Sequence, residues 1–395
     1  MRRFMLRGSA RAMAGPRVGV VAALLVAFFS ADRAAAQGEW EITPESEAAL
    51  NRGLDWLSKN QGPEGNWGSN DLGLVSMGAL AFLSAGHVPG RGPHGQACQR
   101  ALEYVMANVK PSGLLNIADA QRDMYNHGLA TFVLGQAYGM CDDQRVGSIL
   151  DRALKLIAET QCGDGGWDYR AERKPQGHDL SLAVMQAKAL RSAVDSGLEV
   201  PPEVIELAIR SVREHYSPSG VSRQAPEDEQ KKRDGQFTYT RSGGQATTAM
   251  AAAGVVCLQE FAQYDDWRIE KSMKVVCKAI EEKARGGKSR EAPFNDAYTL
   301  YYVGQALYQV GGEPWKKYYP RLRDSLVHSQ VIEPDKPSEH GMWRSGQRVG
   351  GKPGELYMTS AACFVLAMPN RYLPILQEGR IEAVERQFQP APANP

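Results

Sequence analysis

The sequence predicts an all-α protein in which six helical hairpins close into a single ring, an (α/α)6 toroid. Helical periodicity runs through most of the chain, and segments that alternate apolar and polar residues as strands do are scarce. Amphipathic helices alternate with helices that are apolar on almost every face, and a helix of the second kind must be buried. We therefore expect inner apolar helices surrounded by outer amphipathic helices.

Each expected hairpin consists of an outer helix, a polar loop and an inner helix. The outer helices are expected to begin near Glu45, Gln96, Val146, Pro202, Trp267 and Trp315. The inner helices are expected to begin near Asp71, Tyr125, Asp179, Gln245, Asp296 and Leu356. The resulting period of roughly 50 to 65 residues is typical of repeat architectures. An open solenoid needs polar caps at both ends, but the first and last inner helices are as apolar as the middle ones. A closed ring, which hides both, is therefore favoured.

A motif recurs where outer helices end. Gln61 closes the first outer helix and is followed by Gly65-x-Trp67, and the same spacing returns 100 residues later in Gln161 and Gly165-x-Trp167. A stretched copy runs from Gln330 to Gly341-x-Trp343. We expect the Gln amide to bond the free carbonyls at the end of the outer helix and the Trp to be buried under the turn. The expected role of Gln61, Trp67, Gln161 and Trp167 is structural.

These motifs fit the QW motif, and the chain resembles the prenyltransferase and squalene oxidase repeat family over residues 45–376. This resemblance implies the toroid of the terpenoid cyclases and protein prenyltransferases. It does not carry over their chemistry. The Asp-x-Asp-Asp acid of the squalene cyclases is missing. The prenyltransferases bind zinc through Asp, Cys and His, and only the Asp has a counterpart here, Asp296. Tyr298 stands where the family has Cys, and Glu355 and Tyr357 stand where it has His.

All loops from outer to inner helices lie at one end of such a ring, where the inner helices present their N-termini to a cavity expected to be apolar. Polar residues that converge on an apolar cavity are typical of a small-ligand site, and helix N-termini favour anions. The candidate catalytic residues are Asp179, Asp296, His127 and His178; the two His could share a proton or a metal. The Asp could equally be helix caps, and the His structural. The candidate ligand-binding residues are Tyr125, Asn126, Gln245, Asn295, Tyr298, Glu355 and Tyr357.

The first residues predict a cleaved signal peptide, residues 1–36, and hence a periplasmic or secreted protein. Arginines precede an apolar run over residues 18–29, and Ala34-Ala35-Ala36 supplies the small residues of a cleavage site. Sec and Tat export both remain open. A linker (37–44), the toroid domain (45–380) and a disordered Pro-rich tail (381–395) are expected to follow. Among the six cysteines, Cys98 and Cys141 could lie at the same level and form a disulfide.

Three functions remain open from the sequence. The first is a module without catalytic activity that binds a protein partner or an apolar, isoprenoid-like ligand with an anionic end. The second is an isoprenoid- or terpenoid-processing enzyme, and the third a carbohydrate-active (α/α) barrel. No cofactor and no metal site are expected. The residues after the signal peptide carry a small net negative charge, which argues against nucleic acid, and none of their apolar runs is long enough to span a membrane.

Overall fold

The computed structural model describes residues 40–285, 296–345, 348–349 and 352–377. The chain divides into two compact units, Met1–Thr43 and Pro44–Pro395. All the helices and strands described below belong to the second unit. The predicted signal peptide (residues 1–36) and tail (381–395) lie outside the described residues, as does Asn295.

The described residues of the second unit form six helical hairpins, as the sequence predicts. The outer helices are α2 (Pro44–Asn60), α4 (Gly95–Ala107), α6 (Arg145–Thr160), α8 (Pro202–Glu214), α11 (Trp267–Arg285) and α13 (Gly312–Ser329). The inner helices are α3 (Leu72–Ser84), α5 (Asp123–Tyr138), α7 (Leu180–Asp195), α10 (Thr248–Glu260), α12 (Ala297–Val310) and α14 (Glu355–Ala367). The remaining elements are short: η1 (Ala120–Arg122), β1 (Tyr216–Pro218), α9 (Glu227–Lys231), β2 (Gly235–Phe237), β3 (Arg348–Val349), β4 (Lys352–Pro353), η2 (Met368–Asn370) and η3 (Pro374–Leu376).

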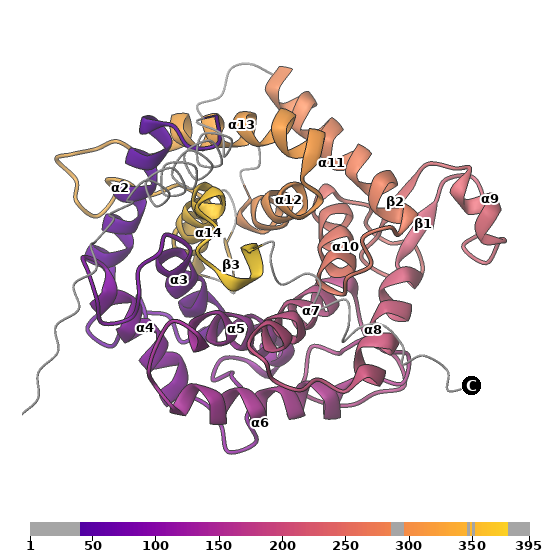
Figure 1. Cartoon of the computed structure of the whole chain (residues 1–395), viewed down its shortest axis with the longest axis horizontal. Helices are drawn as coiled ribbons and strands as arrows, with labels where there is room; N and C mark the ends of the chain where they lie inside the picture. The colour runs from indigo at the N-terminus through magenta and orange to yellow at the C-terminus, as the bar shows by residue number, and fades with distance from the viewer. Residues whose placement is uncertain (1–39, 286–295, 346–347, 350–351, 378–395) are drawn as a thin grey trace, which may run out of the picture. The chain divides into compact units, whose positions relative to one another are not determined.

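The hairpins close into a ring. Each inner helix packs against the next, and α14 returns to pack against both α3 and α2. Figure 1 shows the inner helices as a circle with the outer helices around it. Strands contribute two short antiparallel pairs, β1 with β2 and β3 with β4. The fold is therefore an all-α toroid, and its closure removes the two apolar ends that an open stack would expose.

Side-chain caps decide where four inner helices begin. The carboxylates of Asp71, Asp179 and Asp296 accept hydrogen bonds from backbone N–H groups of the following turn, as does the hydroxyl of Thr247. Such caps satisfy donors that have no partner inside the helix. The inner helix expected near Gln245 begins at Thr248, because Thr247 supplies the cap and Gln245 lies before it with a left-handed φ of 50°.

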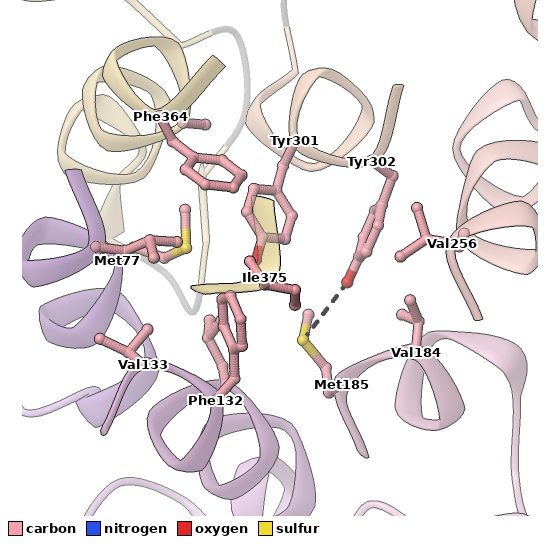
Figure 2. Packing of buried hydrophobic residues seen from close by; sticks show 14 of the residues in the cluster. Met77, Phe132, Val133, Val184, Met185, Val256, Tyr301, Tyr302, Phe364 and Ile375 are labelled. Atoms are coloured by element: carbon pink, nitrogen blue, oxygen red, sulfur yellow. Dashed lines mark hydrogen bonds between the residues drawn. The ribbon is translucent and has the colours of Figure 1, made fainter. Parts of the chain in front are cut away.

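The centre of the ring is filled by side chains. Phe132, Tyr301, Tyr302 and Phe364 are fully buried there, and Figure 2 shows them with Met77, Met185 and Ile375 from around the ring. The hydroxyl of Tyr302 donates to the sulfur of Met185 at 3.5 Å. The expectation of one apolar cavity surrounded by the inner helices is therefore wrong for the centre, since large aromatic side chains occupy it.

The Gln and Trp of the repeated motif connect successive outer helices. Gln61 Nε2 donates to Gly65 O (3.1 Å) and to Ala97 O of the next outer helix (2.9 Å), while the Trp67 indole donates to Leu57 O (2.8 Å). The expected roles are thus partly exchanged, because the Trp rather than the Gln bonds the carbonyl near the end of its own outer helix. The other two copies repeat these contacts. In the second copy Gln161 donates to Val204 O and Trp167 to Ile157 O. In the third copy Gln330 donates to Ala49 O and Trp343 to Leu326 O.

The third copy of the motif closes the ring. Gln330 follows α13, the last outer helix, and bonds Ala49 in α2, the first one, at 2.8 Å. The turn glycine allows the close approach: Gly341 has a φ of +96°, and a Cβ there would lie 2.4 Å from Arg52 O of α2. The stretched copy thus has the same geometry as the regular ones.

All six cysteines are free thiols, so the disulfide considered for Cys98 and Cys141 is not formed. Cys98 is buried on α4, and burial raises the pKa of its thiol. None of the described helices is long and apolar enough to cross a membrane.

Candidate functional site

A pocket of about 450 Å³ opens at the end of the ring where the outer-to-inner loops lie. We call it the mouth pocket. The first turns of inner helices α5, α7, α10, α12 and α14 contribute to its wall, together with the loops that precede α7 and α10. Its polar and aromatic lining consists of Gln121, Arg122, Tyr125, Tyr169, Ser181, Tyr239, Gln245, Thr247, Asp296, Tyr298, Thr299 and Tyr357.

Five tyrosines dominate this wall. Tyr125, Tyr298 and Tyr357 come from the first turns of α5, α12 and α14, whereas Tyr169 and Tyr239 come from loops. Tyr357 is only 5% exposed, and its hydroxyl has no hydrogen-bond partner in the described part of the chain. Burial raises the pKa of Tyr125, Tyr298 and Tyr357, so all three remain neutral phenols. The wall thus offers flat apolar rings with polar edges.

The charges that line the mouth pocket balance. Arg122 is its cation, and its Nε lies 2.8 Å from a carboxylate oxygen of Asp71, the cap of α3. Asp296 is its anion. Both oxygens of Asp296 are engaged in capping α12, because one accepts from Tyr298 N at 3.2 Å and the other from Thr299 N at 3.1 Å and from the Thr299 hydroxyl at 2.5 Å. The described residues of the wall thus carry one cation and one anion, and their charges cancel.

Asp179 lies behind the wall instead of in it. One carboxylate oxygen accepts from Ser181 N at 2.9 Å, which caps α7, and the other lies 2.8 Å from His178 Nδ1. The hydroxyls of Tyr169 and Tyr239 are hydrogen-bonded to each other. Burial, and then the negative charge of Asp179, raise the pKa of both tyrosines. Asp179 thus holds α7 and the loop tyrosines in place, while its own side chain is fully buried.

The two candidate histidines do not form a common site. His127 is fully buried; its Nδ1 accepts from Leu115 N at 3.1 Å, and its Nε2 therefore carries the proton that faces Ala153 O at 3.0 Å. Burial lowers the pKa of His127 to about 4. His178 is half exposed and pairs with Asp179. Because both nitrogens of His127 are bound to backbone groups, the proton or metal that the sequence suggested for the pair has no place there.

The other candidates divide between the wall and its surroundings. Gln245 lines the rim, whereas Asn126 is buried and bonds Asn116 Oδ1 at 2.9 Å. Glu355 begins α14 and is not part of the lining. Sequence reasoning missed Arg122, Tyr169 and Tyr239, because Arg122 lies in the short turn η1 before α5 and the two tyrosines lie in loops, where the helix-opening pattern gives no signal. Within the described ranges, no group of three or more His, Cys, Asp or Glu could hold a metal ion.

No family model matches the chain, and no curated protein matches it in sequence. Among solved structures, it is similar to the GH76A α-1,6-mannanase of Salegentibacter sp. HEL1_6, with a TM-score of 0.53 and 10% identity over 83% of this chain and 98% of the mannanase. A variant of that enzyme inactivated at two adjacent aspartates, in complex with α-1,6-mannotetrose, also gives 0.53 at 10% identity, over 85% and 100%.

A type II terpene cyclase from Scytonema, in complex with geranylgeranyl dihydroxybenzoate, is 12% identical over 83% of this chain and 98% of the cyclase. Its TM-score of 0.29 is too low to carry an argument. The likeness to the mannanase and the ring itself define the chain as an α/α toroid. At such low identity, the shared property is the fold alone.

Proposed function

We propose that the chain is an exported ligand-binding toroid that holds a neutral, hydroxyl-rich ligand, such as the end of an oligosaccharide, in the mouth pocket without converting it. One observation carries the proposal: five tyrosines surround a cavity of about 450 Å³, and the described residues of its wall include one cation and one anion. Sugars present apolar C–H faces that pack on aromatic rings and hydroxyl groups that bond to polar edges, and tyrosine offers both. Export rests on the predicted signal peptide.

An isoprenoid ligand fits the described residues less well. A long hydrocarbon chain needs an apolar space, and Phe132, Tyr301 and Phe364 occupy the centre of the ring. A diphosphate needs cations or a metal, yet Arg122 is already paired with Asp71. The motif shared with terpenoid cyclases and prenyltransferases concerns the Gln–Trp contacts that build the ring. It therefore does not favour an isoprenoid substrate.

Hydrolysis of a glycan is disfavoured by the carboxylates. Glycoside hydrolases generally use two carboxylates that flank the scissile bond, one as an acid and one as a base or nucleophile. In the mouth pocket, Asp296 is engaged as a helix cap, and Asp179 is buried behind the wall with both oxygens bonded. The adjacent pairs Asp142-Asp143 and Asp265-Asp266 lie in the connections from inner to outer helices. We therefore favour binding over turnover.

The test is calorimetric titration of the purified protein with α-1,6-mannotriose, an α-glucan trisaccharide and geranylgeranyl diphosphate. The Salegentibacter mannanase variant in complex with α-1,6-mannotetrose suggests an α-1,6-mannan oligosaccharide as the starting ligand. Tyr239→Ala removes a half-buried ring from the rim and should weaken oligosaccharide binding about tenfold, since an aromatic contact contributes about 0.5–1.5 kcal/mol beyond the area it buries. Tyr357→Phe removes only a buried hydroxyl and should have a smaller effect.

Tyr372→Ala is the matched control, because Tyr372 is 52% exposed and does not line the mouth pocket. Asp296→Asn keeps a capping side chain and removes the charge, so it should preserve the fold and change only the ligand contacts. Binding of the diphosphate alone, or equal affinities for Tyr239→Ala and Tyr372→Ala, would refute the proposal. Release of shorter sugars from either trisaccharide would place the chain among the carbohydrate-active enzymes instead.

A further inference from the structure

A second hollow, which we call the arginine pocket, lies between outer helices α8 and α11 and the insertion that carries β1, α9 and β2. Figure 1 shows these elements on the outer side of the ring. The pocket has a volume of about 570 Å³. Its charged lining consists of Arg210, Arg213, Arg223, Arg241, Arg268, Glu206 and Glu214. Five guanidinium groups thus stand against two carboxylates, and neither the mouth pocket nor the repeat motif accounts for them.

Three of the arginines are fixed by carboxylates. Arg213 Nε lies 2.8 Å from Asp266 Oδ2, and Arg268 Nη1 lies 3.0 Å from Asp266 Oδ1. Arg241 pairs with Asp164 and, at 3.4 Å, with Glu214. These pairs hold the guanidinium groups in set orientations, which lowers the ordering cost of binding a ligand.

The other two arginines have no carboxylate partner among the described residues. Arg223 donates only to neutral oxygens, including Glu214 O at 3.1 Å and the Thr238 hydroxyl at 2.8 Å. Arg210 is exposed on α8, and no ion pair in the described ranges includes it. The carboxylates of Asp164, Glu214 and Asp266 are already shared among Arg213, Arg241 and Arg268. Glu206, the other carboxylate of the lining, forms no ion pair in the described ranges, and with it four carboxylates stand against five guanidinium groups. The described residues of the pocket therefore retain positive charge.

A buried hydroxyl adds a second feature of a binding site. Tyr216 lines the pocket and is 2% exposed, and its hydroxyl has no hydrogen-bond partner in the part of the chain that the structure describes. The Arg268 guanidinium lies 6.0 Å from the centre of its ring. Leaving a buried polar group without a partner is unfavourable, so an acceptor that reaches this hydroxyl gains a favourable bond. Oxyanions are such acceptors.

We infer that the arginine pocket binds an oxyanion group, of the sulfate or phosphate kind, with Arg210 and Arg223 as its charge-bearing contacts. Guanidinium groups form paired hydrogen bonds with such oxygens, and these are roughly twice as strong as neutral ones. The segment of residues 239–247 borders both pockets, because Tyr239 and Gln245 line the mouth pocket and Arg241 lines the arginine pocket. The source of the oxyanion is either the free ion or a sulfated glycan. The oxyanion site itself does not depend on the proposed mouth-pocket ligand.

The test is titration with sodium sulfate at constant ionic strength, with sodium chloride as the reference salt, followed by calorimetry or the shift in melting temperature. Arg210→Gln should weaken sulfate binding about tenfold, since a bond between charged groups is lost, and Arg210→Lys should restore part of it. Arg223→Gln alone should weaken sulfate binding more than Arg210→Gln does, and circular dichroism checks that this variant still folds. Arg321→Gln is the matched control, because Arg321 is an exposed arginine of α13 outside the arginine pocket, and this variant should bind sulfate as the unaltered protein does.

Two arms identify the source of the oxyanion. A sulfated oligosaccharide that binds much more tightly than both sulfate and its unsulfated counterpart indicates a glycan, whereas equal affinity for sulfate and the sulfated sugar indicates the free ion. Tyr239→Ala should leave sulfate binding unchanged, which separates this site from the mouth pocket. Absence of sulfate binding, or a loss of affinity no larger in Arg210→Gln and Arg223→Gln than in Arg321→Gln, would overturn the inference.

Discussion

Replacing Gln330 tests whether its contacts hold the ring closed. The Gln330 side chain makes three hydrogen bonds: it donates to Ala49 O and Gly341 O at 2.8 Å each and accepts from Arg52 Nε at 2.9 Å. It is 6% exposed, so water does not replace these partners easily. Gln330→Met keeps the length of the side chain and removes all three bonds. At about 1 kcal/mol for each bond, the free energy of unfolding should fall by about 3 kcal/mol.

The assay combines urea unfolding with amide hydrogen exchange. Gln61→Met removes a matching set of bonds, to Gly65 O, Ala97 O and Arg100, from a joint between adjacent hairpins, and should cost a similar amount. The exchange patterns should differ, because Gln330 joins the first and last hairpins. Protection in α2 and α13 should fall most in Gln330→Met, whereas α4 should be affected most in Gln61→Met.

Gln144→Met is the control, since Gln144 is exposed before α6 and its side chain makes no capping bond. A loss in Gln330→Met as small as in this control would show that the contacts of Gln330 contribute nothing to stability. Equal loss of protection in all six hairpins would contradict its role as the joint that closes the ring.

Three further predictions concern a buried histidine, a buried ion pair and a turn glycine. Burial lowers the pKa of His127 to about 4 in the folded protein from an ordinary value of 6.5, so between these pH values the unfolded chain binds more protons than the folded one. The free energy of unfolding should therefore fall by up to about 3 kcal/mol from pH 6.5 to pH 4. Urea unfolding across this pH range measures the fall, which should be smaller in His127→Gln. Lys188→Met leaves Glu260, 3.2 Å from the ammonium in the native core, buried without its cation and should cost about 3–5 kcal/mol, with Glu260→Gln in the same chain recovering part of the loss in thermal unfolding. Gly165→Ala should lower the melting temperature, because φ is +86° there and the new Cβ would lie 2.1 Å from Leu207 O. Gly197→Ala should lower it less, because its Cβ would meet no atom within 4 Å.

The errors at the mouth of the ring have a simple helical cause. The sequence predicts Tyr125 and His127 together in the site, yet residues two apart on an α-helix point about 200° apart. Tyr125 therefore lines the mouth pocket, while His127 faces α6 and bonds Ala153. Tyr357 and Glu355 diverge in the same way. The sequence pattern marked the right turns of the right helices, but which residue of each turn faces the pocket depends on how the helix is rotated in the ring.

The sequence alone determined the helical hairpins, their alternation and most of their starting points, because these depend on residues within a few turns of one another. The Asp that begin inner helices are an example, since the N–H groups they cap lie two or three residues away. Only the tertiary structure decided that the aromatic side chains fill the centre, that Tyr169 and Tyr239 reach the mouth pocket, and that arginines from α8, α11 and the insertion meet in one hollow. These features join residues that are far apart in the chain, and no local pattern encodes the distance between them.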